Sequence, residues 1–465
     1  MTLEGRAPIE ILQKWVKSEY LIVAFISIVG FAFYLWILTR HPLIYGIDGP
    51  YYLIQVRSLQ ERGSLEYGDP PLAFLLFTLL TLLVGGDITL GVRLGVALFS
   101  ALSSVPLHFL VKRITRMEHA GYVAMLAGIF SAPHIRMMND LLKNAVGVCF
   151  LLFFVYYLHD MAFTGRNRKN LFLASLFLVL TGATHILDFG VALLFLGLYF
   201  VMAVVLDINK GSIAKSLGIL VSILGFFVAV AFTVFPSLFT DFYKGLRFLQ
   251  DLFAASVGAH PILFLLDPRG GGLIVPVLTV GIVLTVYEWR KEERETALVL
   301  STVTVIGWML ALPFIPPHWL WRFLLMEFIP VALILGYSAS KMGRRIGVAI
   351  FFILCVSPLV VQSMEATRAM GPTINEGGYH ELEEMRSVIP SNSVVVVHPR
   401  LGYWVQYVTR CDIASRPSPD LWRSYLHVLI LHQEPPPPKL PPGSVILFHG
   451  NVFALVELPR PKLAE

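Results

Sequence analysis

The stretch YGIDGPYYLIQVRSLQERGSLEYGDPPLAFLLF, residues 45–77, directly follows the first long apolar run of the chain. It carries two aspartates, Asp48 and Asp69, and two proline-containing turns between hydrophobic flanks. After the Gly-Pro turn that follows Asp48, the sequence PYYLIQVRSLQERG has the pattern of an amphipathic helix that lies on a membrane surface. The Pro-Pro pair after Asp69 opens a second surface helix. This loop places ionisable groups against the bilayer, so both fold and function depend on the side of the membrane it occupies.

The composition is typical of a polytopic membrane protein. Of the 465 residues, 56% are hydrophobic and 14% charged, and the mean hydropathy of +0.70 is too high for a soluble globular chain. The net charge is +5, but lysines and arginines cluster in short segments between apolar runs, which indicates membrane topology and excludes nucleic acid as a partner. The three cysteines form no disulfide framework. Basic residues before the first apolar run predict a signal anchor.

Eleven segments are predicted to span the membrane, because a spanning helix needs about 17–25 mainly apolar residues. They are 20–39, 88–110, 119–134, 141–158, 171–186, 190–206, 216–236, 271–287, 297–315, 323–340 and 346–364.

The segment 71–85 is nearly as long as the shortest of these spans, and charge decides against its crossing. If it lies along the outer surface, every basic segment falls on the side of the N-terminus, as the positive-inside rule requires. If 71–85 crossed the membrane, every basic segment except the N-terminal tail would fall on the opposite side. The basic segments are the N-terminal tail, Lys112/Arg113/Arg116, Arg166/Arg168/Lys169, Lys210/Lys215, Arg290/Lys291/Arg294 and Lys341/Arg344/Arg345.

The predicted fold class is an all-α polytopic domain over residues 1–365, with a first outer loop over 40–87, followed by an extracytoplasmic α/β domain over 366–465. The chain is predicted to lie in the cell membrane with its N-terminus in the cytoplasm. In the C-terminal domain we expect helices at HELEEMRSVIP and LWRSYLHVLILHQ, strands at SVVVVHP, SVILFHG and VFALVEL, and a polyproline spacer at EPPPPKLPP.

Three outer-face acids are candidate catalytic residues, each with a structural alternative. Asp48, on a turn at the end of the first span, is either a general base or a solvated loop acid or helix cap. Asp69 is either catalytic or the cap of the helix opened by the Pro-Pro pair. Asp140, in PHIRMMNDLLKN, is either functional or an acid at the start of the next span.

Histidines and arginines at the same face are candidates for binding. His185 and Asp188, in THILD, form a hairpin cap or an ion pair, and they lack the spacing of a zinc site. Arg269, in LLDPRGGG, and Arg322, in PPHWLWRF, either snorkel to the interface or hold a lipid phosphate, which a guanidinium fork matches. Glu327 lies within a span, where a buried acid usually faces a cavity.

The order of these motifs resembles that of the GT-C superfamily of integral-membrane glycosyltransferases. The motifs are DGPYYL with a surface helix, PPL with a second surface helix, GVRLGVALFSAL, PHIRMMNDLLKN and THILD. The resemblance covers about the first 210 residues. It implies a transferase that takes a sugar from a polyprenyl- or dolichyl-phosphate carrier at the outer leaflet, with inversion. The acceptor is a protein, a glycan or a lipid.

The resemblance also implies residue roles. Asp48 occupies the position of the catalytic first-loop acid, and Asp140 matches the second-loop acid that coordinates a metal in oligosaccharyltransferases. Arg322 and Arg269 are the local candidates for holding the carrier phosphate. We add His318 to them, and we predict that sugar or lipid is contacted by Tyr51, Tyr52, Trp319 and His185.

Two departures from the family pattern bear on the substrate and the cofactor. Gly49 follows Asp48 where protein O-mannosyltransferases carry Asp-Glu, and the Trp-Trp-Asp signature of oligosaccharyltransferases is absent, which argues against transfer of a whole oligosaccharide and against a metal requirement. No cofactor is therefore assigned. Binding of a divalent cation, Mg²⁺ or Mn²⁺, by Asp48 and Asp140 remains an open alternative. A transporter or lipid flippase, supported by Glu327, and a non-catalytic assembly subunit are the alternative functions.

Overall fold

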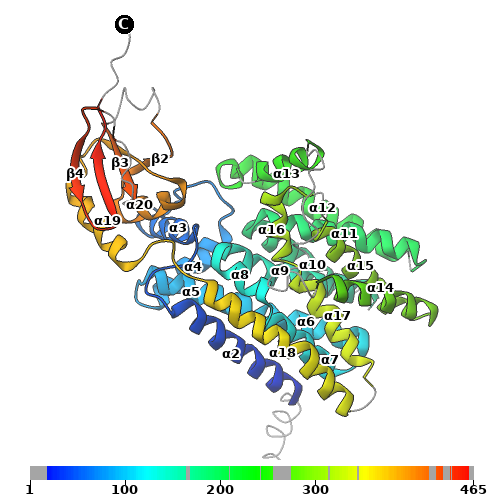
Figure 1. The fold of residues 1–465 in the computed structure, drawn as a ribbon. Coiled ribbons are helices and arrows are strands. Elements are labelled where there is room, and N and C mark those ends of the chain that lie inside the picture. Colours follow the sequence, from blue (N-terminus) through cyan, green and yellow to red (C-terminus); the bar gives the residue numbers. More distant parts are fainter. Residues whose placement is uncertain are drawn as a thin grey trace, which may run out of the picture.

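The computed structural model describes residues 18–163, 168–208, 210–240, 242–254, 274–312, 315–342, 345–417, 426–432, 440 and 442–459. The helical part consists of α2 (Ser18–Thr39), α3 (Gly49–Arg62), α4 (Leu72–Leu83), α5 (Ile88–Leu102), α6 (Ser104–Thr115), α7 (Glu118–Ile129), α8 (Ala132–Asp140), α9 (Leu142–Phe163), α10 (Arg168–Thr184), α11 (Ile186–Val205), α12 (Lys210–Val234), the 3₁₀ turn η1 (Pro236–Phe239), α13 (Phe242–Ala254), α14 (Ile274–Arg290), α15 (Arg294–Leu310), α16 (Pro317–Leu324), α17 (Phe328–Ser340) and α18 (Arg345–Ala369). Figure 1 shows them as a bundle whose long members run side by side.

Every predicted span coincides with helical structure. Within the described residues, seven helical segments are long and apolar enough to cross a membrane: Glu19–Thr39, Ile88–Thr115, Leu142–Phe163, Ile186–Val205, Ile213–Val234, His318–Ser340 and Ala349–Ala369. The other four predicted spans correspond to α7, with 12 residues, and to α10, α14 and α15, with 17 residues each. The polytopic helical fold is thereby confirmed, and the eleven-span threading stays a prediction.

The helix α4 does not carry the chain to the other end of the bundle. Arg93, near the start of α5, donates hydrogen bonds to the carbonyl oxygens of His41, Pro42 and Leu43, at 2.7, 3.0 and 2.8 Å. Those three residues directly follow α2, so the chain leaves α2 and enters α5 at the same end. The two surface helices α3 and α4 are therefore an excursion at that end, as the charge pattern predicts.

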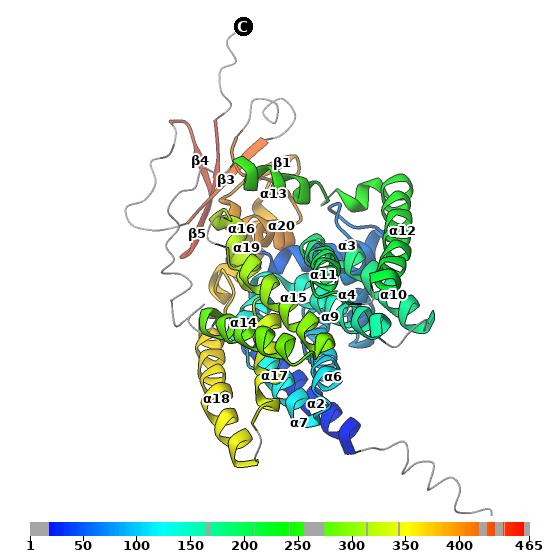
Figure 2. The same ribbon diagram turned by 90° about the vertical axis from the view of Figure 1, so that its right-hand side faces the viewer.

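Ion pairs gather the basic segments at the opposite end. Lys112, at the end of α6, pairs with Glu19 at the start of α2. Lys341, just after α17, pairs with Glu288 of α14 at 2.7 Å. In the same region, Arg113 lies 3.5 Å from Glu295 and 3.7 Å from Asp160. The helix ends that the positive-inside rule assigns to one side of the membrane thus meet in space. Figure 2 shows the first residues of α2 and α18 at the end opposite the sheet.

The C-terminal domain is a five-stranded mixed sheet packed against two helices. Its elements are α19 (Glu376–Val388), β1 (Ser393–Val396), α20 (Pro399–Thr409), β2 (Asp412–Ala414), β3 (Leu426–His432), β4 (Val445–His449) and β5 (Phe453–Glu457). The strand order is β2-β1-β3-β5-β4, with β1 parallel to β2 and β3, and β5 antiparallel to β3 and β4. The predicted helix at 380–390 and the predicted strands at 393–399, 444–450 and 452–458 are confirmed.

The predicted helix over LWRSYLHVLILHQ is wrong. The described part of this segment is the strand β3, which lies between β1 and β5. A strand in the middle of a sheet is a continuous apolar run, and periodicity alone cannot distinguish such a run from a buried helix. The helix α20 was not predicted, although Pro399 at its start and Arg410 in the left-handed conformation at its end (φ 62°) delimit it. Most of the polyproline spacer lies outside the described residues.

The C-terminal domain docks on α3 through α20. Arg57 of α3 donates a hydrogen bond to the carbonyl oxygen of Tyr407 at 2.6 Å and lies 4.8 Å above the Tyr407 ring. Arg410 pairs with Glu61 at 3.0 Å. Buried side chains of both domains form one hydrophobic cluster, in which Trp404 of α20 is 1% exposed. The docking fixes the sheet domain at the end of the bundle where α3 and α4 lie (Figure 1).

Candidate functional site

A cavity of about 1040 Å³ lies at the end of the bundle that carries the C-terminal domain. Its walls come from α3, α9, α11, α13, α16 and α20. Figure 1 shows α3 and α20 to the left of α13 and α16. The volume is at the upper limit of the range usual for small-molecule sites. The polar side chains of its lining are Asp48, Tyr51, Tyr52, Tyr67, Asp69, Lys143, Asn144, His185, Lys244, Trp319, Arg322 and Tyr403.

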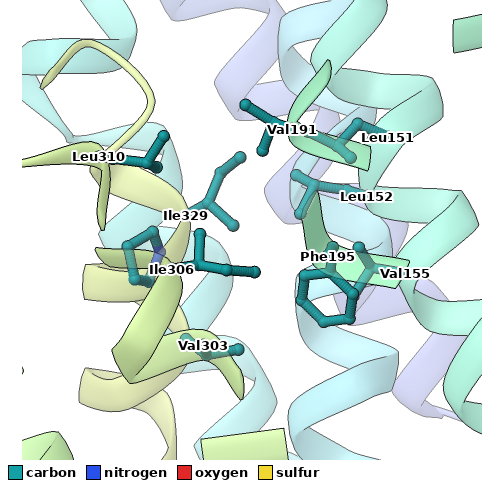
Figure 3. Close-up of a pocket in the computed structure, with 10 residues that line it drawn as sticks. Leu151, Leu152, Val155, Val191, Phe195, Val303, Ile306, Leu310 and Ile329 are labelled. Carbon is teal, nitrogen blue, oxygen red and sulfur yellow. The ribbon is translucent and has the colours of Figure 1, made fainter. Parts of the chain in front are cut away.

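The remainder of the lining is largely apolar. It includes side chains of α11, α12, α13 and α15, among them Phe189, Leu194, Val228, Leu252 and Leu310. Beyond Leu310 the helices close: a void of only about 20 Å³, roughly the space of one water molecule, lies between α9, α11, α15 and α17 (Figure 3). The cavity thus joins an apolar chamber to a group of ionisable residues, and it ends against a tightly packed core.

Asp48 lies at the start of α3 and lines the cavity. Its backbone takes the N-cap position, but its side chain makes no capping hydrogen bond, so the capping alternative is not realised. Burial raises the pKa of the Asp48 carboxyl above its usual value, while the positive charges of Arg322, Lys143 and Lys244 act in the opposite direction. A partly buried carboxylate that faces cations across a cavity has the environment of a general base.

Asp69 forms a buried ion pair and does not cap α4, whose N-cap position is Pro71. The Lys143 ammonium contacts both Asp69 oxygens, with Nζ 2.5 Å from Oδ2, and the Tyr51 hydroxyl donates to Oδ2 at 2.7 Å. Asp69 is 1% and Lys143 7% exposed. The capping alternative is therefore wrong, because α9 supplies a cation that no local pattern of the loop reveals. The pair ties the first loop to the start of α9.

We expect a Lys143→Met variant to be destabilised by about 3–5 kcal/mol, because it leaves the Asp69 carboxylate buried without its cation. Thermal unfolding of the purified protein in detergent measures the effect. The double variant Asp69→Asn/Lys143→Met removes both charges, and we expect it to recover most of the loss. A single variant as stable as the double variant would contradict the assignment of this pair.

A loop over residues 67–69 connects three parts of the cavity wall. The Tyr67 hydroxyl donates to Gln406 Oε1 of α20 at 2.5 Å. The Thr240 hydroxyl, between η1 and α13, donates to the Gly68 carbonyl oxygen at 3.1 Å. A methyl group at Gly68 would lie 2.1 Å from the Ser237 carbonyl oxygen, so only glycine permits this approach. With Asp69 bound to Lys143, the loop holds α20, α9 and the segment before α13 together.

Arg322 projects from α16 into the cavity lining. Its guanidinium carbon lies 5.7 Å from the Trp319 ring centroid and 5.3 Å from that of Trp321. Its Nε is buried and has no hydrogen-bond partner within the described part of the chain. Two rings thus hold the guanidinium while donor capacity remains, which suits an anionic ligand. Lys244 of α13 lines the same cavity. Sequence reasoning missed it, and its place in an amphipathic segment was the only available signal.

Of the other predicted phosphate-binding residues, Arg269 lies outside the described residues, and His318 is not part of this cavity lining. His318 is exposed, and its Nε2 lies 3.2 Å from Asp251 of α13, which also accepts a hydrogen bond from Trp319 Nε1 at 3.0 Å. His318 therefore links α16 to α13.

His185 lines the cavity and belongs to a second polar group. Its Nδ1 lies 3.6 Å from Asp188 Oδ2, and Asp188 Oδ1 accepts a hydrogen bond from Asn144 at 3.3 Å. A methyl group at Gly147 would lie 2.0 Å from the Asp188 carboxylate, so glycine makes room for it. Of the two alternatives, the structure brings His185 and Asp188 together at the distance of an ion pair, and the His185 side chain, at the N-cap position of α11, makes no capping hydrogen bond.

Asp140 is close to Asp48 but does not line the cavity. It ends α8, accepts a hydrogen bond from Asn139 at 2.7 Å, and its pKa is raised by burial and by the negative charge of Asp48. Leu141 separates it from α9, so it is not a first-turn acid of that helix. No cluster of three or more His, Cys, Asp or Glu side chains able to hold a metal ion occurs among the residues that the structure describes.

Glu327 lies between α16 and α17 and is fully buried. Both carboxyl oxygens lack a hydrogen-bond partner among the described residues, and the side chain is not part of the cavity lining. The neighbouring Phe328 ring stacks on His134 at 4.2 Å. Glu327 was expected to face a cavity, but it does not line the cavity described above.

The sequence matches no protein-family model and no curated protein. The structure resembles the oligosaccharyltransferase of Archaeoglobus fulgidus in the apo form, with TM-score 0.62 and 13% identity over 85% of this chain and 64% of that one. The complex of the A. fulgidus oligosaccharyltransferase AglB with an inhibitory peptide and a dolichol-phosphate gives TM-score 0.57 and 13% identity over 86% of this chain. This chain thus spans less than two thirds of the oligosaccharyltransferase's length.

A second similar structure is matched over nearly the whole of both chains. ArnT from Cupriavidus metallidurans bound to undecaprenyl phosphate gives TM-score 0.58 and 11% identity over 95% of this chain and 98% of that one. At 11–13% identity, these likenesses establish the fold.

Proposed function

We propose that this chain, which has the GT-C fold, is a membrane glycosyltransferase. In the proposed reaction a sugar passes from a polyprenyl- or dolichyl-phosphate carrier to an acceptor at the extracytoplasmic face, with inversion at the anomeric carbon. The observation that carries the proposal is the composition of one cavity, in which a carboxylate faces two cationic side chains beside an apolar chamber. A prenyl-phosphate sugar needs these three environments together.

The proposed step is a single displacement. The acceptor hydroxyl oxygen forms a bond to the anomeric carbon while Asp48 takes the hydroxyl proton, and the bond from the anomeric carbon to the phosphate oxygen breaks. The prenyl phosphate leaves with the electron pair of that bond. A positioned base contributes typically a hundred- to ten-thousand-fold to such a step. Attack opposite to the leaving phosphate inverts the configuration.

Arg322 and Lys244 are proposed to stabilise the negative charge that develops on the leaving phosphate. Both line the cavity, and both lower the pKa of Asp48, so their fields reach the carboxylate. Preorganised cations in a site with little water are among the larger contributions to catalysis. Tyr51, Tyr52 and Trp319 are proposed to contact the sugar or the first isoprene units, and the apolar chamber to receive the carrier chain.

The alternative classes have less support. An assembly subunit was expected to place Asp48 far from any pocket, whereas Asp48 lines the cavity. The transporter alternative rested on Glu327, and that carboxyl is not part of the cavity lining. The location of the cavity beside the external domain also favours an enzyme that acts at one face.

No step of the proposal passes through a metal ion. Asp48 and Asp140 are near enough for each to sense the other's charge, but only Asp48 lines the cavity. The two carboxylates alone do not form a closed ligand set, and the cations of Arg322 and Lys244 supply positive charge at the phosphate. The fit of these residues to Mg²⁺ or Mn²⁺ is therefore poor.

The experiment uses the purified full-length protein and a panel of farnesyl-phosphate monosaccharides. We expect one of them to be consumed, with farnesyl phosphate released and a product of inverted anomeric configuration identified by NMR. We also expect farnesyl phosphate alone to raise the thermal unfolding midpoint, since a ligand stabilises the state that binds it. A protein that neither binds farnesyl phosphate nor consumes any donor would contradict the proposal.

A further inference from the structure

We infer that the acceptor is a carbohydrate hydroxyl, and that Tyr403 of the external domain is a specificity-determining residue for it. This inference rests on the proposed function and adds the acceptor class to it. Its basis is a cluster of three tyrosines, Tyr51, Tyr67 and Tyr403, that forms one part of the cavity lining and that we call the tyrosine wall.

The tyrosine wall is assembled from three separate segments. Tyr51 comes from α3, Tyr67 from the first outer loop and Tyr403 from α20. The centroid of the Tyr51 ring lies 5.1 Å from that of Tyr403 and 5.6 Å from that of Tyr67. The centroids of the Tyr67 and Tyr403 rings lie 6.2 Å apart. All three rings are half-buried. The Tyr51 and Tyr67 rings are stacked, with 25° between their planes, and the Tyr403 ring is tilted by 57° and 72° to them. All three residues line the cavity.

Hydrogen bonds hold two of these rings in place. The Tyr51 hydroxyl donates to Asp69 at 2.7 Å and accepts from Gln55 at 3.0 Å. The Tyr67 hydroxyl donates to Gln406, a neighbour of Tyr403 on the same helix, at 2.5 Å. The wall is therefore pre-organised, and a ligand that packs on it does not have to order the side chains first.

A sugar ring matches such a surface. One face of a pyranose carries several C–H groups, which pack on aromatic faces, and its edge carries hydroxyl groups, which need hydrogen-bond partners. The same lining carries the Asp48 carboxylate, which can accept a hydrogen bond from that edge. Tyr51 follows Asp48 by three residues on α3, so a sugar on the wall has a hydroxyl near the proposed proton acceptor.

The donor phosphate is assigned to the other side of the cavity. Arg322 and Lys244 belong to α16 and α13, which lie across from α3 and α20 in Figure 1. Asp48 lies at the start of α3, on the side of the tyrosine wall, and within the field of both cations. The two substrates thereby approach the carboxylate from different directions, as a displacement with inversion requires.

A peptide acceptor fits this lining less well. Extended peptides are commonly bound by main-chain hydrogen bonds to a strand edge. In the part of the chain that the structure describes, every residue of the lining belongs to a helix or a connecting loop, and none to β1–β5. The external domain contributes its helix α20 to the site instead, through an aromatic side chain.

The test measures transfer to two acceptor classes by the full-length protein in nanodiscs. The donor probes are the farnesyl-phosphate monosaccharides, and the acceptor probes are octyl glycosides and short peptides containing Ser, Thr and Asn. We expect transfer to octyl glycosides. A Tyr403→Leu variant should raise the KM for the glycoside about tenfold while leaving the KM for the donor unchanged. Tyr403→Phe keeps the ring, so its KM for the glycoside should lie closer to that of the wild type than to that of Tyr403→Leu.

Tyr243→Leu is the matched control, because Tyr243 is an exposed tyrosine of α13 that is not in the cavity lining. It should change neither KM. Transfer to peptides alone, or a Tyr403→Leu variant with an unchanged KM for the glycoside, would overturn the inference while the proposed function stands. If no donor is consumed and farnesyl phosphate does not bind, the proposed function fails, and the inference fails with it.

Discussion

An Asp48→Asn variant is expected to lose between about a hundred- and ten-thousand-fold in the rate of sugar transfer while remaining folded. Asparagine has the shape of aspartate but cannot take up the acceptor proton. Because the Asp48 side chain makes no capping hydrogen bond, the substitution removes no structural contact that would unfold α3. The measurement is the initial rate of farnesyl-phosphate release in the presence of acceptor.

Asp140→Asn is the matched control for this variant. Asp140 is also partly buried near the first loop, and its carboxyl also has a raised pKa, but it is not part of the cavity lining. We expect its rate to fall less than tenfold. If the Asp140 variant loses as much activity as the Asp48 variant, the two acids act together and the assignment of a single base is wrong. A fully active, folded Asp48→Asn protein would remove the base assignment entirely.

Replacing Arg322 with glutamine is expected to lower kcat by about a hundred- to a thousand-fold, the usual effect of removing one preorganised group that stabilises developing charge. The guanidinium lies against two tryptophan rings, and Arg322 is part of the cavity lining. Arg322→Lys keeps the charge but loses the planar fork, and we expect an intermediate rate.

The same substitution should move the pH profile in a defined direction. Burial raises the pKa of Asp48, and the positive charge of Arg322 is the largest of the effects that lower it. Without Arg322 the pKa of Asp48 rises further, and the carboxyl works as a base only when it is deprotonated. The acid limb of kcat/KM should therefore shift to higher pH. Arg247→Gln is the control, because Arg247 is an exposed residue of α13 outside the cavity lining. It should leave the pH of the acid limb of kcat/KM unchanged.

Much of the membrane domain was predictable because its signals are local. Each predicted span is a run of apolar residues, and lipid selects for such a run wherever it occurs in the chain. The surface helices of the first loop follow from two proline-containing turns. The prediction that 71–85 does not cross the membrane follows from the positions of lysine and arginine, and the contacts of Arg93 place the start of α5 at the same end of the bundle as the end of α2.

The candidate site was predictable only in part. Asp48, Arg322, Trp319 and His185 were selected from their positions at the outer ends of predicted spans and from the resemblance to the GT-C superfamily, and all four line one cavity. Asp69 was interpreted mainly as a helix cap, since the two prolines that follow it are a local signal. Its real partner is Lys143, 74 residues away.

By itself, the amino-acid sequence determined which segments are apolar helices, which loop carries the first acid and at which end of the bundle many of the acids and cations gather. Hydrophobicity and turn-forming residues act over a few neighbours, so these features can be predicted from short windows. Only the tertiary structure decided that Lys143 neutralises Asp69, that Lys244 joins Arg322, that HVLILH is a strand and that Tyr403 reaches the cavity from the external domain. Each of these depends on a partner far away in the chain, such as the 339 residues between Tyr67 and Gln406, and packing selects that partner only after the helices and the sheet have come together.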